Sequence, residues 1–421
     1  MIAEILSTGE EVRSGAVIDT NAAYIAQCLE ARGIEVARHL CVGDDVEKIS
    51  DSLRMIAPGA DFAVVTGGLG PTGDDLTADA AAMAFGVNLR LDSKAMENVT
   101  EFFRRRNRKM SPSNEKQAWL PEGAEMLYNP TGTAPGFMFR FEECCFFFLP
   151  GVPSEMVRMM HDAVLPRIAR LRKDDRQVFA VRTLCVFGLP EPVIGERLAV
   201  TEKAFQGVRL GLRSVFPEVQ VKLYGRAESQ EALEKNLDDA ADRVCSIIGD
   251  YVFSRSGLSM EAVVGNLLKA QNATLAVSES CTGGLISHLL TEVAGSSDYF
   301  LFSGVTYSNE AKIKVLGVSR ETLDRFGAVS EQTAMEMARG ARRISGADYA
   351  VSTTGIAGPD GGGPEKPVGT VCIGFAGPKE VVAWRYCLDF ADRSRNKQVF
   401  AMKALDQLRR SLLNTRQRPT D

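Results

Sequence analysis

The chain opens with short apolar runs that alternate with amphipathic segments. The pattern predicts strands at residues 1–8, 34–43 and 61–68, and helices at 20–33, 46–57 and 75–86. This alternation is typical of an α/β domain around a parallel sheet. In such sheets ligands bind beyond the carboxyl ends of the strands. The segments that fall at those ends are 7–15, 43–45 and 66–75.

Two further regions follow the first. Between residues 171 and 253, a strand, a helix, a hairpin and a long amphipathic helix predict a small α+β domain. From 254 to 421, strands and helices alternate again. We therefore expect an α/β chain of three domains. Three-layer α/β domains with mostly parallel sheets form residues 1–170 and 254–421, and the α+β domain lies between them in sequence.

Composition narrows the class of protein. Hydrophobic residues make up 45% and charged residues 24% of the chain, as in soluble globular proteins. A net charge of −5 argues against nucleic acid as the main partner. The nine cysteines include no Cys-x-x-Cys pair, which favours reduced thiols in a cytoplasmic protein. No apolar run is long enough to span a membrane, and the N-terminus lacks the pattern of a signal peptide.

The segment from Ala294 to Lys312 carries candidate hydrolytic chemistry. It holds two adjacent serines, two tyrosines and a lysine, in a chain with three histidines. A lysine with a lowered pKa can replace histidine as the base for a serine nucleophile. A serine-rich loop followed by a strand and a helix start is the alternative interpretation. Spacing alone does not separate Ser297 from Ser296 or Ser308 as the nucleophile.

A second candidate site is the glycine-rich segment TGGLGPTGDDLT, from Thr66 to Thr77. Glycines let backbone N–H groups approach a phosphate, and a helix is predicted to follow. Asp74 and Asp75 are expected in the first turn of that helix. They either cap the helix or, together with Asp44, hold a divalent metal beside a diphosphate.

Residues 1–170 resemble the molybdopterin-binding-like domain of the CinA (competence/damage-inducible) family. The motifs that carry the resemblance are TNAAYIAQCLEARGI, VGDD, TGGLGPTGDDLT, NPTGTAPGF and LPGVPSEM. In that family the domain is associated with a metal-dependent ADP-ribose pyrophosphatase activity. The resemblance therefore implies ADP-ribose as a ligand and Mg²⁺, Mn²⁺ or Co²⁺ as the metal.

The resemblance also implies which side chains form this N-terminal site. The expected metal ligands are Asp44, Asp74 and Asp75. The expected nucleotide contacts are Glu11, Asn21, Gly67, Gly68, Gly70, Thr72, Asn129 and Gly132. One departure is the first loop, GEEVRSG, in which Val12 and Arg13 replace two apolar residues of the family pattern. The departure favours the alternative that the domain is a non-catalytic nucleotide- or pterin-binding module.

Residues 254–421 resemble the C-terminal CinA domain, which also occurs alone as bacterial nicotinamide mononucleotide deamidase. The matching segments are SESCTGG, TEVAGSSDYF, GVTYSNEAK, GAVSEQTA, STTGIAGPDGGGPEKPVGTV and the pair Asp392–Arg393. The implied reaction converts nicotinamide mononucleotide to nicotinic acid mononucleotide and ammonia, as part of pyridine nucleotide recycling. No cofactor is expected for it.

The resemblance implies roles for named residues of this domain. Ser297 is the expected nucleophile, Lys312 its base and Tyr307 a partner in proton relay. Ser280, Cys281 and Ser308 are competing nucleophiles. The expected substrate contacts are Ser280, Thr282, Gly283, Thr354, Gly355, Ala357 and Arg393, with Arg393 on the 5′-phosphate.

The middle region resembles the KH-like linker domain of the same family. It has no Gly-x-x-Gly loop between residues 171 and 253, so no RNA binding is expected. A homodimer is implied by the family. A different class of function, a competence or DNA-damage accessory protein, is the remaining alternative to an enzyme.

Overall fold

A computed structural model describes residues 1–171, 177–199, 207–390 and 392–417. The described residues form two compact units. Unit 1 comprises residues 1–181 and 226–233, and unit 2 comprises 182–225 and 234–421. The middle region, expected as a domain of its own, thus contributes to both units. Among the described helices, none is both long and apolar enough to cross a membrane.

Unit 1 is built on a six-stranded sheet with the order β2-β1-β3-β8-β7-β6. The first four strands are mutually parallel, and β7 and β6 complete the sheet in antiparallel pairing. The strands are β1 (Ile2–Thr8), β2 (Glu35–Val42), β3 (Phe62–Thr66), β6 (Glu125–Leu127), β7 (Gly136–Phe141) and β8 (Cys144–Leu149). A separate two-stranded sheet pairs β4 (Leu89–Leu91) with β5 (Trp119–Pro121).

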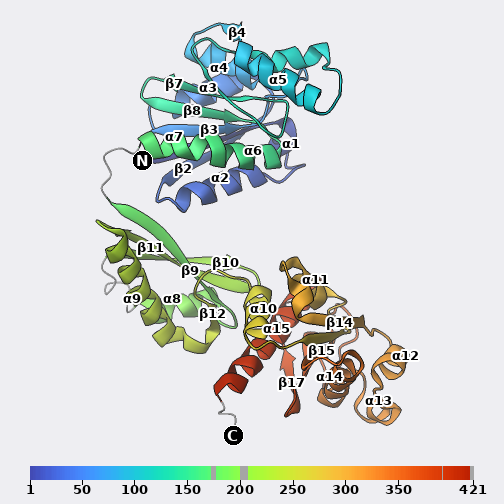
Figure 1. Ribbon diagram of the computed structural model, residues 1–421. Coiled ribbons are helices and arrows are strands. Elements are labelled where there is room, and N and C mark those ends of the chain that lie inside the picture. The colour runs from blue at the N-terminus through green and yellow to red at the C-terminus, as the bar shows by residue number, and fades with distance from the viewer. Residues whose placement is uncertain (172–176, 200–206, 391, 418–421) are drawn as a thin grey trace. The chain divides into compact units, whose positions relative to one another are not determined.

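Helices cover both faces of this sheet, as Figure 1 shows. On one face are α3 (Val46–Ile56), α4 (Thr77–Phe85) and α5 (Ser93–Arg105). On the other are α2 (Thr20–Glu30), α6 (Pro153–Met159), the π-helical turn η2 (Met160–Val164) and α7 (Leu165–Leu171). Two short helical segments, α1 (Glu10–Arg13) and η1 (Pro112–Ala118), lie in loops. The expected three-layer α/β arrangement is confirmed.

The central strands β3 and β8 are buried at every position because helices cover both faces of the sheet. All five residues of β3 and all six of β8 are buried, which is the pattern of strands that lie between two helix layers. Asp19 and Asp45 cap α2 and α3, since their carboxylates accept the backbone N–H groups of Ala22 and Lys48. The caps place both helix starts at the carboxyl edge of the sheet.

Unit 2 contains a five-stranded sheet with the order β14-β13-β15-β16-β17. Its strands are β13 (Leu275–Glu279), β14 (Phe300–Val305), β15 (Tyr349–Gly355), β16 (Thr370–Ala376) and β17 (Val381–Cys387). β13 pairs in parallel with β14 and β15, and the last two strands are antiparallel.

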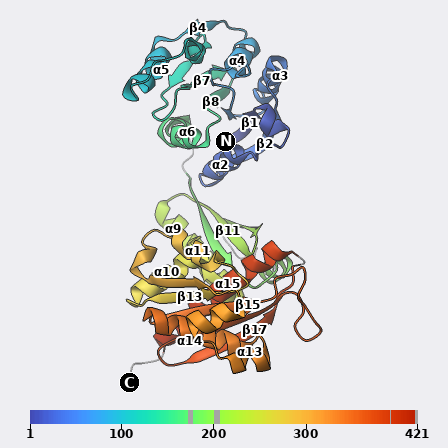
Figure 2. The same cartoon turned by 90° about the vertical axis from the view of Figure 1, so that its right-hand side faces the viewer.

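Helices cover this sheet on both faces, as Figure 2 shows. One face packs against α10 (Met260–Ala270), α11 (Leu285–Glu292) and α15 (Arg393–Gln417). The other packs against α13 (Arg320–Phe326), α14 (Glu331–Ser345) and the π-helical turn η6 (Lys312–Leu316), which follows α12 (Asn309–Ala311). The short 3-10 turn η5 (Ser296–Asp298) precedes β14.

The middle region of the chain, most of which belongs to unit 2, forms a four-stranded sheet with two helices. Its strands are ordered β10-β11-β9-β12, and β12 runs antiparallel to β9. The elements are β9 (Val178–Val186), α8 (Glu191–Ala199), β10 (Val208–Val215), β11 (Glu218–Ala227), α9 (Gln230–Ile248), the 3-10 turn η4 (Gly249–Tyr251) and β12 (Val252–Ser254). The order strand, helix, hairpin, helix is the one expected for residues 171–253. Phe187 and Phe253 share one buried cluster with residues of α10 and α15.

Candidate functional site

The most unusual side chain of unit 2 is Lys312, a lysine that is 1% exposed. Its Nζ lies 3.1 Å from Ser280 Oγ, 3.0 Å from the carbonyl oxygen of Thr306 and 3.0 Å from that of Tyr307. All three partners are uncharged oxygens. Burial therefore dominates, and it lowers the pKa of the Lys312 ammonium from its ordinary value of 10.5.

The three partners of Lys312 can be satisfied by an ammonium, which donates to all three oxygens, and also by a neutral amine. A neutral amine has two N–H groups and one lone pair. The two carbonyls accept the two N–H groups, which leaves the lone pair directed at the Ser280 hydroxyl. In that state Ser280 donates its proton to Nζ, as a nucleophile donates to its general base.

The topology of the sheet brings Ser280 and Lys312 together. Ser280 directly follows β13 and Thr306 directly follows β14, and these neighbouring strands are parallel. Both residues therefore lie at the same carboxyl edge. The backbone N–H of Ser280 donates to the carbonyl of Thr353 on the other neighbour, β15. Ser280 is thus fixed between three strand ends and is 8% exposed.

A buried carboxylate holds the turn that carries Ser280. Glu279 is 0% exposed. Its oxygens accept the backbone N–H groups of Gly284, Ile286 and Ser287, and also the Ser287 hydroxyl. These are the otherwise unpaired donors at the start of α11, whose first residue has no side-chain cap. Glu279 therefore fixes both the helix start and the turn between Ser280 and Gly284.

The structure contradicts the predicted pairing of Ser297 with Lys312 within one chain. Ser297 lies in η5, before the amino end of β14, and its side chain is exposed. Lys312 contacts the residues that follow the carboxyl end of the same strand. A strand of this length separates its two ends by roughly 17 Å, at about 3.3 Å per residue. Ser280, which was only a competing candidate, is the serine at Lys312.

Two basic side chains stand beside this pair at the start of α15. Arg393 donates to the carbonyl of Gly358 at 2.6 Å and to the hydroxyl of Tyr307 at 3.2 Å. The Nζ of Lys397 lies 3.5 Å from the point that a Cβ on Gly283 would occupy. Arg393 and Lys397 are one helical turn apart, so they share a face of α15. The expected role of Arg393 at a phosphate has a suitable setting here, and the proton-relay role of Tyr307 stays a prediction.

Most of the other predicted site residues of this domain are buried or make their hydrogen bonds within the protein. Cys281 is buried, and burial raises the pKa of its thiol to about 12, which makes it a poor nucleophile. The remaining side chains bond within the protein: Thr282 to Thr353, Thr354 to the Ala328 carbonyl, and Ser308 as the N-cap of α12. Gly355 packs against Thr370 and Cys281, and the carbonyl of Ala357 accepts from Asn396.

In unit 1, the glycine-rich segment forms a turn at the carboxyl end of β3. Thr77, the first residue of α4, donates through its N–H to the Gly68 carbonyl and through its hydroxyl to the Gly67 carbonyl. Gly67 and Gly68 both have positive φ, at +110° and +63°. A Cβ at Gly68 would collide with the Thr77 side chain. The sequence needs glycine here because the turn is folded tightly onto the start of α4.

A cavity of about 360 Å³ lies beside this turn. Most of the predicted site residues line it: Glu11, Asn21, Asp44, Gly67, Gly68, Gly70, Asp74 and Asp75. Asp19 and Glu155 add two further carboxyl groups. The cavity is therefore strongly acidic. Burial, and then the nearby charges of Glu11, Asp74 and Asp75, raise the pKa of the Asp44 carboxyl.

The carboxylates of this cavity meet only part of the needs of a metal ion. Among the described residues, no three or more His, Cys, Asp or Glu side chains are grouped closely enough to hold one by themselves. Mg²⁺ commonly takes one or two carboxylates and completes its shell with water and substrate phosphates. Asp44 and Asp74 fit that partial role. The grouping of these carboxyl groups around one cavity is the observation that favours a cation among them.

The prediction that Asp74 and Asp75 lie in the first turn of a helix is wrong. The helix α4 begins two residues later, at Thr77, with Leu76 as its N-cap residue. Asp75 instead accepts from the backbone N–H and the hydroxyl of Thr72, which closes a turn over the glycine loop. Thr72 thus acts through Asp75 and does not line the cavity.

Asn129 and Gly132 act through Glu155. Asn129 is 1% exposed and donates to Glu155 Oε2 at 2.7 Å. Its Oδ1 accepts the backbone N–H groups of Thr131 and Gly132. A Cβ on Gly132 would collide with the Glu155 carboxyl group. Burial raises the pKa of that carboxyl, and the bond from Asn129 partly opposes the shift.

The unusual first loop leaves the cavity open. Arg13 forms an ion pair with Glu10, three residues earlier in α1, and does not line the cavity. Val12 does line it. Of the two residues that depart from the family pattern, Val12 gives the cavity an apolar wall residue, and Arg13 is paired with Glu10 outside the lining.

Comparison with known proteins identifies the relatives of the chain. The family model described as "CinA C-terminal domain" matches residues 258–412, and the one described as "Probable molybdopterin binding domain" matches residues 4–170. A CinA-like protein of Desulfosudis oleivorans is 54% identical over 98% of this chain and 100% of its own length. Another from Desulforapulum autotrophicum is 50% identical over 97% of this chain and 98% of its own.

The chain belongs to the CinA family.

Solved structures of CinA proteins resemble part of the chain. The competence/damage inducible protein CihA from Agrobacterium tumefaciens is 41% identical and covers 37% of this chain and 93% of that one, with a TM-score of 0.36. The protein CinA from Thermoplasma acidophilum is 31% identical and covers 41% of this chain and 99% of that one, with a TM-score of 0.37.

The sequence analysis of this CinA protein did not predict three of the residues at the two sites: Lys397, Glu279 and Glu155. Lys397 lies four residues after Arg393, the spacing that places two side chains on one face of a helix, so the sequence alone could have shown that the two lie together. Glu279 is an acid shortly before a helix start, and Glu155 an acid in the first turn of α6. Acids at such positions usually cap helices, so their burial beside a candidate site becomes visible only in the fold.

Proposed function

We propose that the C-terminal domain of this CinA protein hydrolyses the carboxamide of nicotinamide mononucleotide. The observation that carries the proposal is the buried Lys312, whose Nζ faces the Ser280 hydroxyl. The Ser280 proton passes to the Lys312 nitrogen as Ser280 Oγ bonds to the amide carbon. The Lys312 ammonium then returns the proton to the departing nitrogen, which leaves as ammonia. Water hydrolyses the Ser280 ester to release nicotinic acid mononucleotide.

The surrounding groups support the same proposal. Arg393 and Lys397 offer two cations at the mouth of the Ser280 turn, where a 5′-phosphate would need them. Two backbone carbonyls hold the Lys312 nitrogen beside the Ser280 hydroxyl. An expected homodimer and a cytoplasmic location accompany the proposal.

The test measures ammonia release from nicotinamide mononucleotide by the wild type and by Ser280→Ala. We expect the variant to lose activity by about a thousandfold, since nucleophile and base act as a unit. Ser297→Ala is the matched control and should keep wild-type turnover. An inactive wild type would remove the function. A fully active Ser280→Ala, or an inactive Ser297→Ala with an intact fold, would instead remove the mechanism.

We further propose that unit 1 hydrolyses ADP-ribose to AMP and ribose 5-phosphate with a divalent cation. The support is the acidic cavity beside the glycine turn, in which Asp44 is repelled by neighbouring carboxylates. Asp44 and Asp74 would hold the cation, which would neutralise the diphosphate. AMP formation should depend on Mg²⁺, Mn²⁺ or Co²⁺ and should fall in Asp44→Asn. ADP-ribose that binds without turnover would identify a binding module instead.

A further inference from the structure

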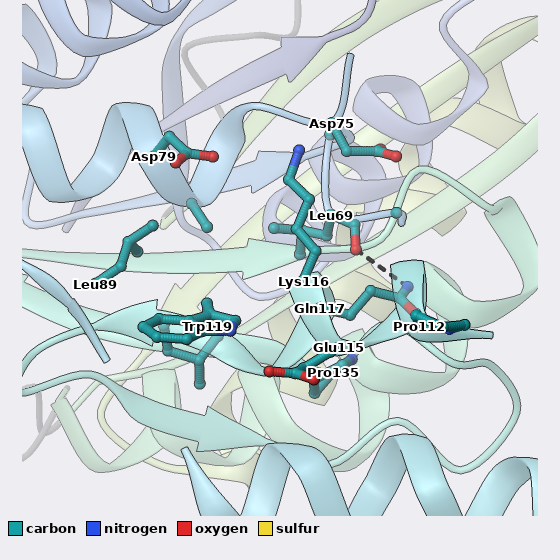
Figure 3. Close-up of a pocket in the computed structure, with 14 residues that line it drawn as sticks. Leu69, Asp75, Asp79, Leu89, Pro112, Glu115, Lys116, Gln117, Trp119 and Pro135 are labelled. Carbon is teal, nitrogen blue, oxygen red and sulfur yellow. Dashed lines mark hydrogen bonds between the residues drawn. The ribbon is translucent and has the colours of Figure 1, made fainter. Parts of the chain in front are cut away.

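The acidic cavity is one of two cavities that meet at the glycine turn of unit 1. The second has a volume of about 400 Å³ and is drawn in Figure 3. The two cavities share the lining residues Gly68, Leu69, Gly70, Asp75 and Gln117. A ligand with two ends and a phosphate-rich centre can therefore occupy both, with its centre over the turn.

The second cavity has the lining expected of a site for a flat aromatic ring. Figure 3 shows Trp119 and Leu89 on the side of the cavity away from the turn. Leu120, Pro112 and Pro135 add further apolar walls. The Trp119 side chain is 40% exposed, so its ring is available for stacking. The one lysine of the lining, Lys116, extends toward the turn and donates to the Thr72 carbonyl.

The acidic cavity ends in two buried polar atoms that lack a partner. Ser7 Oγ and Asn21 Oδ1 make no hydrogen bond with any described residue. Ser7 is 2% and Asn21 9% exposed, and both line the cavity. Buried polar atoms in proteins are nearly always bonded, so two unpaired atoms in one cavity point to a ligand that supplies the bonds.

The chemistry of that end is dominated by hydrogen-bond acceptors. The Asn21 amide nitrogen is already used, because it donates to Thr66 Oγ1 and to the Gly151 carbonyl. Its free Oδ1 is fixed in orientation by those bonds and can only accept. Glu155 adds a carboxyl group held by Asn129. Sugar hydroxyls, which both donate and accept, match this set as they match the carboxylate of dinucleotide-binding folds.

We propose that unit 1 binds ADP-ribose in one orientation. The nucleobase stacks on Trp119, the diphosphate lies over the Gly68–Gly70 turn, and the hydroxyls of the terminal ribose bond to Ser7, Asn21 and Glu155. This orientation rests on the proposed ADP-ribose function for its ligand. It concerns binding, so it is tested without turnover.

The experiment measures binding of three probes to the full-length protein by calorimetry in the presence of Mg²⁺: ADP-ribose, ADP and ribose 5-phosphate. ADP-ribose is supplied as the analogue in which a methylene group replaces the bridging oxygen of the diphosphate, so that it cannot be hydrolysed during the measurement. Ser7→Ala should weaken ADP-ribose about tenfold, since a bond to a buried partner is lost, and should leave ADP unchanged. Trp119→Ala should weaken ADP-ribose and ADP by about tenfold, the scale of one base-stacking contact. It should leave ribose 5-phosphate unchanged, and Trp119→Phe should restore much of the loss.

The matched control is Ser50→Ala. Ser50 is also a buried serine of unit 1 with an unpaired hydroxyl, 1% exposed, but it lines neither cavity. Both serine variants remove an unsatisfied buried group, so neither should lower the melting temperature. Only Ser7→Ala should weaken ADP-ribose. Equal effects of the two serine variants would mean that Ser7 has a purely structural role.

Two outcomes overturn the orientation. If Ser7→Ala weakens ADP as much as ADP-ribose, the adenosine ribose occupies the polar end and the ligand is reversed. If no probe binds more weakly to Trp119→Ala, the apolar cavity takes no base. Tight, orientation-specific binding without AMP formation would contradict the proposed hydrolysis and leave the orientation standing.

Discussion

The two candidate sites of this CinA protein differ in what the chain itself supplies. In unit 2, Lys312 and Ser280 are already in contact, two backbone carbonyls hold the Lys312 nitrogen in place, and burial lowers the pKa of its ammonium. In unit 1, the walls of the cavity are acidic, and two of the buried polar atoms on residues that line it, Ser7 Oγ and Asn21 Oδ1, are unpaired among the described residues. The first site brings its base and its serine together without a ligand, whereas the second needs a cation to balance its charges. The contrast predicts opposite responses to substitution and to metal removal.

The largest expected effect is on the base. Lys312→Arg keeps a positive charge that cannot be removed at ordinary pH, so it should abolish ammonia release, with a loss of about a thousandfold. Lys312→Met should lose as much. Binding of ADP-ribose to unit 1, measured by calorimetry, should stay at its wild-type value in both variants. Substantial turnover by Lys312→Arg would mean that proton transfer does not use this side chain.

Removal of divalent cations should affect the reaction of unit 1 and leave the reaction of unit 2 unchanged. With excess EDTA we expect AMP formation from ADP-ribose to fall by about a hundredfold, since the diphosphate would face unneutralised carboxylates. Ammonia release from nicotinamide mononucleotide, assayed in the same sample, should be unchanged. Equal sensitivity of both reactions would break the contrast between the sites.

The pH dependence should report on Lys312. Burial lowers the pKa of its ammonium from 10.5, and catalysis needs the neutral amine. Ammonia release should therefore rise about tenfold per pH unit below that lowered pKa and flatten above it. The folded state also binds this proton less tightly than the unfolded state. Lys312 should thus contribute more to the unfolding free energy as pH rises from the lowered pKa toward 10.5, relative to Lys312→Met.

A smaller effect should follow from Lys397→Met. If this side chain meets the phosphate, the KM for nicotinamide mononucleotide should rise about tenfold, the scale of one charged hydrogen bond at a partly exposed site. Turnover at saturation should change little. Nicotinamide riboside, which lacks the phosphate, provides the control substrate and should be hydrolysed equally by wild type and variant. A loss shared by both substrates would show that Lys397 only supports the Gly283 turn.

Much of the fold could be predicted because strands and helices that pack in layers have regular patterns of apolar positions in the sequence. The alternation of apolar strands and amphipathic helices in residues 1–90 predicted the layers of unit 1, and the same pattern predicted the C-terminal sheet. The glycine turn at Gly67 and Gly68 was also visible, since only glycine takes such φ values readily. The sequence did not reveal that Phe187 and Phe253 share a core with α10 and α15. The apolar pattern of each element predicts that one face is buried, but it does not tell which other element covers that face.

The site of unit 2 was only half predictable. Lys312 was predicted from the resemblance to the C-terminal CinA domain, and its lowered pKa from the requirement that a base be neutral. Its partner was not predicted, because strand pairing and not sequence distance determines which serine it meets. Ser297 is fifteen positions away along the chain and Ser280 thirty-two, yet β13 and β14 are parallel and bring Ser280 to the base. Glu155 was missed for a similar reason, since its partner Asn129 belongs to a distant loop.

The shared core of unit 2 determines where the polypeptide can be divided. A fragment that starts at residue 254 would begin after Phe187 and Phe253 and would expose the faces of α10 and α15 that they cover. Phe216 would be lost as well, and with it the edge-to-face contact with Phe390 and the stacking under Arg395, close to Arg393. Limited proteolysis should therefore release a stable fragment by cleavage ahead of β9, whereas cleavage after β12 should yield one that aggregates.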